Sequence, residues 1–196
     1  TTNGSGQLWF TMAPNALYKQ ALSAGVATPL WVGVSNTNYN PVTITPSAST
    51  IVEASIQTGF APRVLEAQTT EKAVNRTWSL KTNNAVSSSL KFGFNTSDLN
   101  VGASATQGMK LIRFNTATNE WEKVGNSTPQ VGQNNTFTVS YENVSLLSSF
   151  VLSNRYSVPV SITNLNSFYC KNAPAVTLTG NPTGGTFTVD GNATSV

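Results

Sequence analysis

Apolar and polar residues alternate over short stretches along most of the chain. In residues 89–95, Leu90, Phe92 and Phe94 fall on one face of an extended segment, and residues 136–141 follow the same pattern. Because successive side chains of a β-strand point to opposite faces, each such row predicts a strand with one buried face. We expect strands near 8–12, 30–34, 41–45, 50–58, 74–82, 87–95, 109–115, 119–124, 136–142 and 149–154.

Turn-forming residues separate these rows. Asn, Asp, Ser and Gly gather at 83–84, 97–98, 115–119, 125–126 and 132–135. Such residues stabilise tight reversals of the chain, and residues 116–119 predict a hairpin connection. Only residues 14–22 suggest a helical turn. Short strands separated by turn signals every 8–12 residues or so are typical of a β-sandwich or β-barrel.

The pattern changes at Ser157, where a second β unit is expected to begin. Residues 158–162, 176–180 and 186–191 again contain alternating apolar positions. A core built from so few residues is rarely stable without disulfides or neighbouring modules. We therefore expect one β module over residues 1–156 and a second, cut-short unit over residues 157–196. Residues 155–159 are the expected linker, with Pro159 limiting its freedom.

The composition argues against most enzymes. Charged residues make up only 10% of the chain, hydrophobic residues make up 39%, and histidine is absent. The absence of histidine removes the commonest general base and the commonest metal ligand. We therefore expect neither a cofactor nor a metal ion.

Two classes of partner are disfavoured. No apolar run is long enough to cross a membrane, so direct membrane insertion is not expected. The net charge is +3, but the cations are scattered along the chain. A nucleic-acid interface is expected to show a clustered basic patch, so no nucleic-acid partner is predicted.

Two small groups of polar residues could carry chemistry. Glu120 and Glu122 flank Trp121, which on a strand places both carboxylates on one face about 7 Å apart. A pair of carboxylates is the basis of glycoside hydrolysis, but a solvated strand face is the favoured interpretation here. Asp98 could form a calcium site with Asn95 and Asn100, although a plain turn explains these residues better.

Aromatic side chains are the best candidates for ligand binding. Three of them, Trp31, Tyr18 and Tyr39, could offer stacking platforms for sugars, with packing against the protein as the alternative for each. Trp31 alternates with Val32 and so faces away from it. Trp78 and Trp121 are expected in the core.

Cys170 is the single cysteine of the chain. A nucleophilic role would require a histidine partner, and the sequence has none. An inert buried thiol and one half of a disulfide with a partner outside the chain both remain open.

Four segments stand out by their order and spacing. They are Leu30-Trp31-Val32-Gly33-Val34 with Tyr39-Asn40-Pro41-Val42-Thr43-Ile44, Val74-Asn75-Arg76-Thr77-Trp78, Leu111-Ile112-Arg113-Phe114 with Trp121, and Ser149-Phe150-Val151-Leu152. Together they resemble a β-sandwich module of large surface proteins of the Bacteroidetes, and the resemblance covers roughly residues 25–154.

The C-terminal segment resembles a different module. Residues 169–176 and 180–187, which include Tyr169-Cys170-Lys171-Asn172, are similar to the start of an immunoglobulin-like repeat of gliding-motility adhesins and related type IX secretion cargo. In that family the cysteine tends to pair with a later one. The resemblance therefore implies that the disulfide partner of Cys170 lies outside this chain.

Together these observations predict an all-β protein with an antiparallel β-sandwich, Ig-like or jelly-roll-like, followed by the start of a second Ig-like β domain. The expected function is that of a non-enzymatic structural or adhesive module of a large secreted cell-surface protein. The alternative is a carbohydrate-binding module of a secreted hydrolase. The expected partners are neighbouring β modules of the same polypeptide, together with surface glycans or other cell-surface proteins.

Overall fold

The computed structural model describes residues 10–11, 16–35, 38–132, 136–146, 148–157, 161–163, 170, 172, 174, 176–181, 187–189 and 192–194. The chain divides into two compact units, Thr1–Tyr156 and Ser157–Val196.

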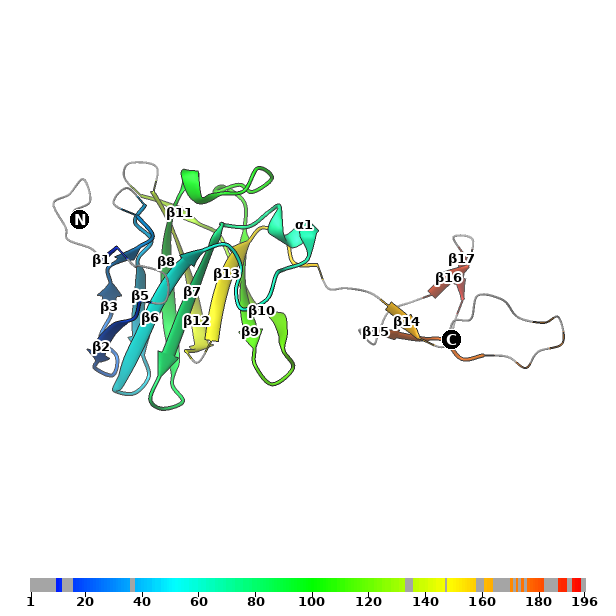
Figure 1. Ribbon diagram of the computed structural model, residues 1–196, viewed down its shortest axis with the longest axis horizontal. Coiled ribbons are helices and arrows are strands. Elements are labelled where there is room, and N and C mark those ends of the chain that lie inside the picture. The colour runs from blue at the N-terminus through cyan, green and yellow to red at the C-terminus, as the bar shows by residue number, and fades with distance from the viewer. Residues whose placement is uncertain are drawn as a thin grey trace. The chain divides into compact units, whose positions relative to one another are not determined.

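A six-stranded antiparallel sheet forms one layer of the first unit, in the order β10-β9-β13-β7-β6-β2. Its strands β6, β7 and β13 lie in front in Figure 1. The strands are β2 (Tyr18–Leu22), β6 (Thr50–Thr58), β7 (Arg76–Thr82), β9 (Met109–Asn115), β10 (Glu120–Ser127) and β13 (Ser148–Ser153).

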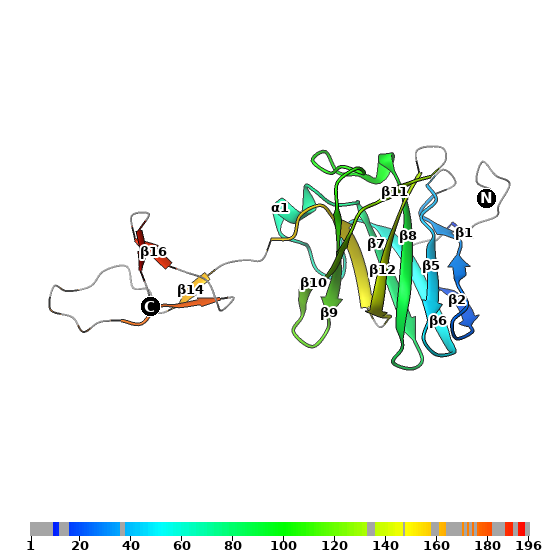
Figure 2. The ribbon, with the colours of Figure 1, turned by 180° about the vertical axis from the view of Figure 1, so that it is seen from behind.

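A five-stranded antiparallel sheet forms the other layer, in the order β11-β12-β8-β5-β3, and is seen from its own side in Figure 2. Its strands are β3 (Thr28–Leu30), β5 (Val42–Pro46), β8 (Ser87–Asn95), β11 (Gln130–Val131) and β12 (Thr136–Ser145). Beside it, β1 (Phe10–Thr11) pairs in parallel with β4 (Val32–Gly33).

The main core fills the space between the two sheets. Trp78 of β7 and Phe92 of β8 are fully buried there and meet edge to face, with ring centroids 5.2 Å apart. The alternating residues Leu90 and Phe94 point the same way as Phe92 and are also buried. The expected all-β sandwich is therefore confirmed, and the alternation that predicted its strands marks the buried faces.

A second, smaller cluster covers part of the outer face of the six-stranded sheet. The segment between β6 and β7, which contains the short helix α1 (Ala67–Thr70), packs Leu65 and Ala73 over Ile112, Trp121 and Val151. Trp121 donates a hydrogen bond from Nε1 to the Arg63 carbonyl oxygen over 2.7 Å. Trp121 is buried as expected, but in this outer cluster, because β9, β10 and β13 are covered on both faces near this point.

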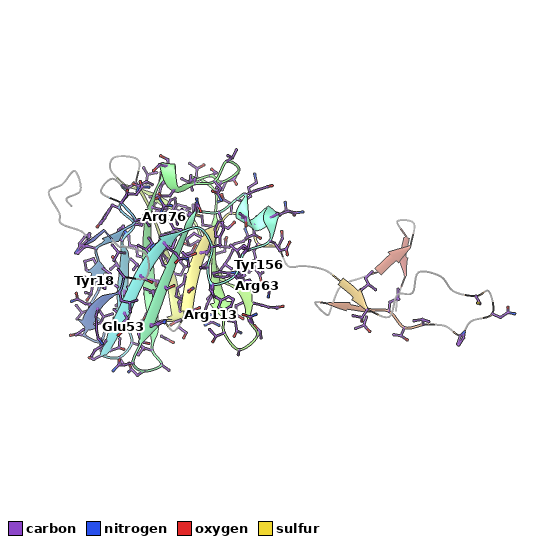
Figure 3. The ribbon with its side chains drawn as sticks, viewed as in Figure 1. Tyr18, Glu53, Arg63, Arg76, Arg113 and Tyr156 are labelled. Atoms are coloured by element: carbon purple, nitrogen blue, oxygen red, sulfur yellow. The ribbon has the colours of Figure 1, made fainter. Side chains whose placement is uncertain are left out.

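Two local expectations are corrected. Residues 18–22 form the edge strand β2, not a helical turn, because β2 pairs with β6 along its whole length. The expected linker begins later than Arg155, because the Tyr156 hydroxyl donates to the Trp121 carbonyl oxygen over 2.5 Å and fastens Tyr156 to the first unit (Figure 3). Pro159 lies outside the described residues.

The described part of the second unit consists of two antiparallel strand pairs. β14 (Ser161–Thr163) pairs with β15 (Thr179–Asn181), and β16 (Phe187–Val189) pairs with β17 (Asn192–Thr194). The side chains of Ile162 and Val176 are exposed.

Candidate functional site: a groove on the six-stranded sheet

A groove of about 680 Å³ lies on the outer face of the six-stranded sheet. Its floor is formed by outward-facing side chains of β6, β7 and β13, beside the part of the sheet that the second cluster covers. Glu53 marks the floor in Figure 3. The groove is lined by Leu17, Glu53, Ser55, Gln57, Ala61, Pro62, Ser79, Lys81, Phe114, Thr116, Ser148 and Ser149.

A row of three serines crosses the floor. Ser55 of β6 is paired with Ser79 of β7, and Ser79 is paired with Ser149 of β13. The hydroxyls of Ser79 and Ser149 are hydrogen-bonded over 2.8 Å. Each hydroxyl is both a donor and an acceptor, so the row offers a ligand both kinds of polar contact.

A row of charges runs parallel to the serines, two residues further along the strands. Lys19 of β2 is paired with Glu53 of β6, and Glu53 is paired with Lys81 of β7. The Lys19 ammonium contacts Glu53 Oε1 at 3.0 Å. Within the described part of the chain Lys81 makes no ion pair or side-chain hydrogen bond. Among the described residues, Lys81 is thus an exposed cation at the groove without an ion-pair partner.

The walls of the groove are apolar, and one of them is anchored to the sheet. Ala61 and Pro62, joined by a cis peptide bond, form the wall that follows β6. Gly59 turns the chain out of β6 with a φ of 85°, a conformation that side chains with a Cβ rarely adopt. The Thr77 hydroxyl donates to the Gly59 carbonyl oxygen over 2.7 Å, and the Ala61 amide donates back to Thr77 Oγ1 over 3.2 Å. These bonds hold the wall in place over β7.

A buried ion pair lies at the other end of β7, inside the sandwich. Arg76 donates from Nη2 to Asp98 Oδ1 over 2.5 Å and from Nε to Asn40 Oδ1 over 3.2 Å. Asp98 Oδ2 accepts from the Asn40 side chain over 2.6 Å and from the Asn95 backbone amide over 2.9 Å. Burial lowers the pKa of Arg76, and the charge of Asp98 partly offsets that effect. The network joins three segments that are far apart in sequence.

Asp98 lies in a turn, as the favoured interpretation has it, and its carboxylate takes part in this network. Asp98 ends the 3₁₀ turn Thr96–Asp98, but its side chain is fully buried against Arg76. The Asn100 side chain donates to the Thr70 carbonyl oxygen over 2.7 Å, and the Asn95 side chain donates to the Tyr39 carbonyl oxygen over 3.0 Å. Among the described residues, no three His, Cys, Asp or Glu side chains gather at a possible metal site.

The two glutamates around Trp121 lie in different surroundings. Glu122 accepts hydrogen bonds from Arg113 and from Asn115, the latter over 3.2 Å. The hydrogen bond from Arg113 lowers the pKa of Glu122, against a smaller opposing effect of burial. Glu120 is exposed. A glycosidase acid needs a raised pKa, so Glu122 is unsuited to that role. The solvated-face interpretation describes Glu120, whereas Glu122 belongs to an ion pair.

The three candidate aromatic residues do not form one platform. Trp31 and Tyr39 are half-buried and stack on each other, with ring centroids 5.8 Å apart and planes 14° from parallel. Tyr18 lies on β2 in the other sheet, packs against the main core and donates to Gln20 Oε1 over 2.7 Å. Burial raises the pKa of Tyr39.

Cys170 is exposed and its thiol is free within the described residues. A disulfide to a partner outside this chain stays a prediction. In the described part of the chain, no helix has the length and apolar character of a membrane span.

The groove itself was not expected from the sequence. Its serines and charged residues occupy the polar positions of alternating rows, which sequence reasoning assigned to the solvent side. The missing information was the strand order, which places Ser55, Ser79 and Ser149 side by side. In comparisons with protein families, curated proteins and solved structures, no match to the chain was found.

Proposed function

We propose that the first unit is a non-enzymatic adhesive module of a large secreted cell-surface protein, and that the groove is its binding surface. The observation that carries the proposal is the groove itself, a long depression with hydroxyl, amide and charged side chains on its floor and apolar walls. Ligand-binding sites typically combine apolar surface with a small number of polar groups.

The chemistry of the groove supports binding over catalysis. Among its described lining residues, Glu53 is the one carboxylate, and it is tied to Lys19. General acid–base hydrolysis of a glycosidic bond calls for two carboxylates on either side of the bond. The secreted, cell-surface setting rests on the weakly charged composition and on the sequence resemblance to Bacteroidetes surface proteins.

The carbohydrate-binding alternative, as expected from the sequence, depends on exposed aromatic side chains that stack on sugar rings. The structure does not favour that form, because Tyr18 packs inward and Trp31 and Tyr39 each cover one face of the other's ring. Recognition of a glycan by the polar floor of the groove is a different arrangement, because it needs no aromatic platform.

The proposal is tested by the retention of protein-coated beads on films of polysaccharides and of matrix proteins. Ser79→Trp fills the centre of the groove and is expected to abolish retention. Thr43→Trp places the same ring on the outer face of β5, in the opposite sheet, and is expected to leave retention unchanged. Urea unfolding of both variants checks that they fold.

Three results would contradict the proposal. The first is equal loss of retention in both variants, and the second is no retention of the wild-type chain on any film. The third is release of reducing ends or peptides from the film polymers by the wild-type chain, because turnover would identify an enzyme.

A further inference from the structure

We infer that the ligand of the groove is an acidic polysaccharide, lying across the strands with a carboxylate beside Lys81 and its hydroxyls over the serine row. This inference rests on the proposed function, because it names the ligand class of the same groove.

The length of the groove calls for an extended ligand. Its lining runs from Leu17, beside β2, across β6, β7 and β13 to Phe114 on β9. Five neighbouring strands are separated by four spacings of about 4.8 Å each, so the groove is about 19 Å long. This length accommodates several consecutive units of a polymer.

The charged residues of the groove leave one lysine, Lys81, available to a negatively charged ligand. The first unit holds ten of the eleven cations of the chain and seven of its eight anions, so the net charge of +3 belongs to this unit. In the groove, the charge of Glu53 is balanced by the ion pair with Lys19, which leaves Lys81 to attract an anion. A carboxylate that approaches Lys81 would lie one strand away from Glu53 and would not need to displace Lys19.

The floor chemistry distinguishes a glycan from an acidic peptide. The backbone groups of β6, β7 and β13 are already paired on both sides, because all three are internal strands. The strand-addition mode of peptide binding needs a free sheet edge, and the floor offers none. The floor instead presents the side chains of Ser55, Ser79 and Ser149, whose hydroxyls match the donor and acceptor character of sugar hydroxyls.

The apolar walls fit the same ligand. Leu17 is 57% exposed at one end of the groove, and Pro62 is exposed along one side. Sugar rings have C–H faces that pack against such surfaces, while their ring substituents remain free to reach the polar floor. The walls therefore add contact area, and the floor gives specificity.

The test measures binding by isothermal titration calorimetry to three probes. These are polygalacturonic acid, its methyl-esterified form, which has the same backbone with the carboxylates masked, and polyglutamate, an acidic polymer without sugar hydroxyls. We expect binding to polygalacturonic acid that weakens as salt is raised, and much weaker binding to the other two. Alginate and hyaluronate serve as further acidic polysaccharides.

Matched charge variants locate the contact. Lys81→Gln is expected to weaken binding about three- to fivefold, the upper range for an exposed charge pair. Lys91→Gln removes an exposed lysine from β8 in the opposite sheet and is expected to have no effect. Both side chains are exposed, so neither variant threatens folding.

Four results would overturn the inference: equal binding of the methyl ester, equal or tighter binding of polyglutamate, equal effects of Lys81→Gln and Lys91→Gln, or no binding to any of the acidic polysaccharides. The proposed function is judged separately. If Ser79→Trp still abolishes bead retention while Thr43→Trp does not, the groove remains the adhesive surface and only the ligand class is wrong.

Discussion

The buried ion pair between Arg76 and Asp98 gives the sharpest stability prediction. The side chains of Arg76 and Asp98 are 5% and 0% exposed, so neither charge is solvated. Asp98→Asn keeps the shape but removes the counter-charge of Arg76 and turns an oxygen acceptor into a donor facing Asn40 or Arg76. Removing one partner of a buried pair costs about 3–5 kcal/mol, a large fraction of a domain stability of about 5–15 kcal/mol.

A double-mutant cycle measures the interaction energy between Arg76 and Asp98 apart from their contacts with other residues. Arg76→Met removes the charge that Asp98→Asn leaves uncompensated, so the double variant is expected to lose clearly less stability than the sum of the two single losses. The coupling should exceed about 1.5 kcal/mol, well above the roughly 0.5 kcal/mol scatter of independent sites.

The assay is urea unfolding followed by tryptophan fluorescence. All four tryptophans lie within residues 1–156, so the signal reports the first unit alone. The unfolding free energy is obtained for the wild type, both single variants and the double variant. A loss below about 1 kcal/mol for Asp98→Asn, or additive losses around the cycle, would show that the pair is not the buried electrostatic contact that the structure describes.

Three further predictions concern single sites. Because Arg113 lowers the pKa of Glu122, this ion pair stabilises the fold above pH 4.5, the pKa of the unfolded state, and its contribution is lost as the pH falls through the lower folded-state pKa. Glu122→Gln should therefore flatten the acid side of a plot of urea midpoint against pH. The lost stability should be under about 1 kcal/mol, because the pair is partly exposed. Gly93→Ala would place a Cβ 2.7 Å from Pro41 Cγ and should cost about 1–3 kcal/mol in urea unfolding. Exposed Cys170 should react with a thiol reagent as fast in native as in denatured protein.

Each of these predictions has a matched control or a contrary result. Glu120→Gln removes an exposed carboxylate of the same strand, and an equal flattening in this variant would contradict the assignment to Glu122. Gly108→Ala meets nothing closer than 3.5 Å, so a loss of stability equal to that of Gly93→Ala would refute the steric argument. Slow labelling in native protein would show that Cys170 is buried.

The strands of the sandwich are readable from the sequence because one face of each is buried. The ranges expected for β6, β8 and β9 coincide with those observed. β2 was missed because Tyr18 and Leu22 are spaced by four residues, which satisfies a helical turn as well as one face of a strand. Pairing with β6 decides between the two, and that contact is not local.

The buried pair of Arg76 and Asp98 and the groove were not predicted from the sequence, because both depend on contacts between segments far apart along the chain. Arg76 shares a row with Val74, Trp78 and Leu80, and its position in an apolar row was the signal of a buried charge. Its partner Asp98 is 22 residues away in a segment that has the composition of a turn. The groove was hidden for a similar reason, because alternation tells which side chains leave the core but not which of them become neighbours.

The position of β13 has a consequence for a chain under tension. β13 is the last strand of the first unit, yet it lies inside the sheet between β9 and β7, and Tyr156 is fastened just beyond it. A terminal strand at a sheet edge peels away by breaking one ladder of hydrogen bonds, rung by rung. A pull on the polypeptide beyond Tyr156 instead loads the ladders on both sides of β13, so the unit resists force where the chain leaves it.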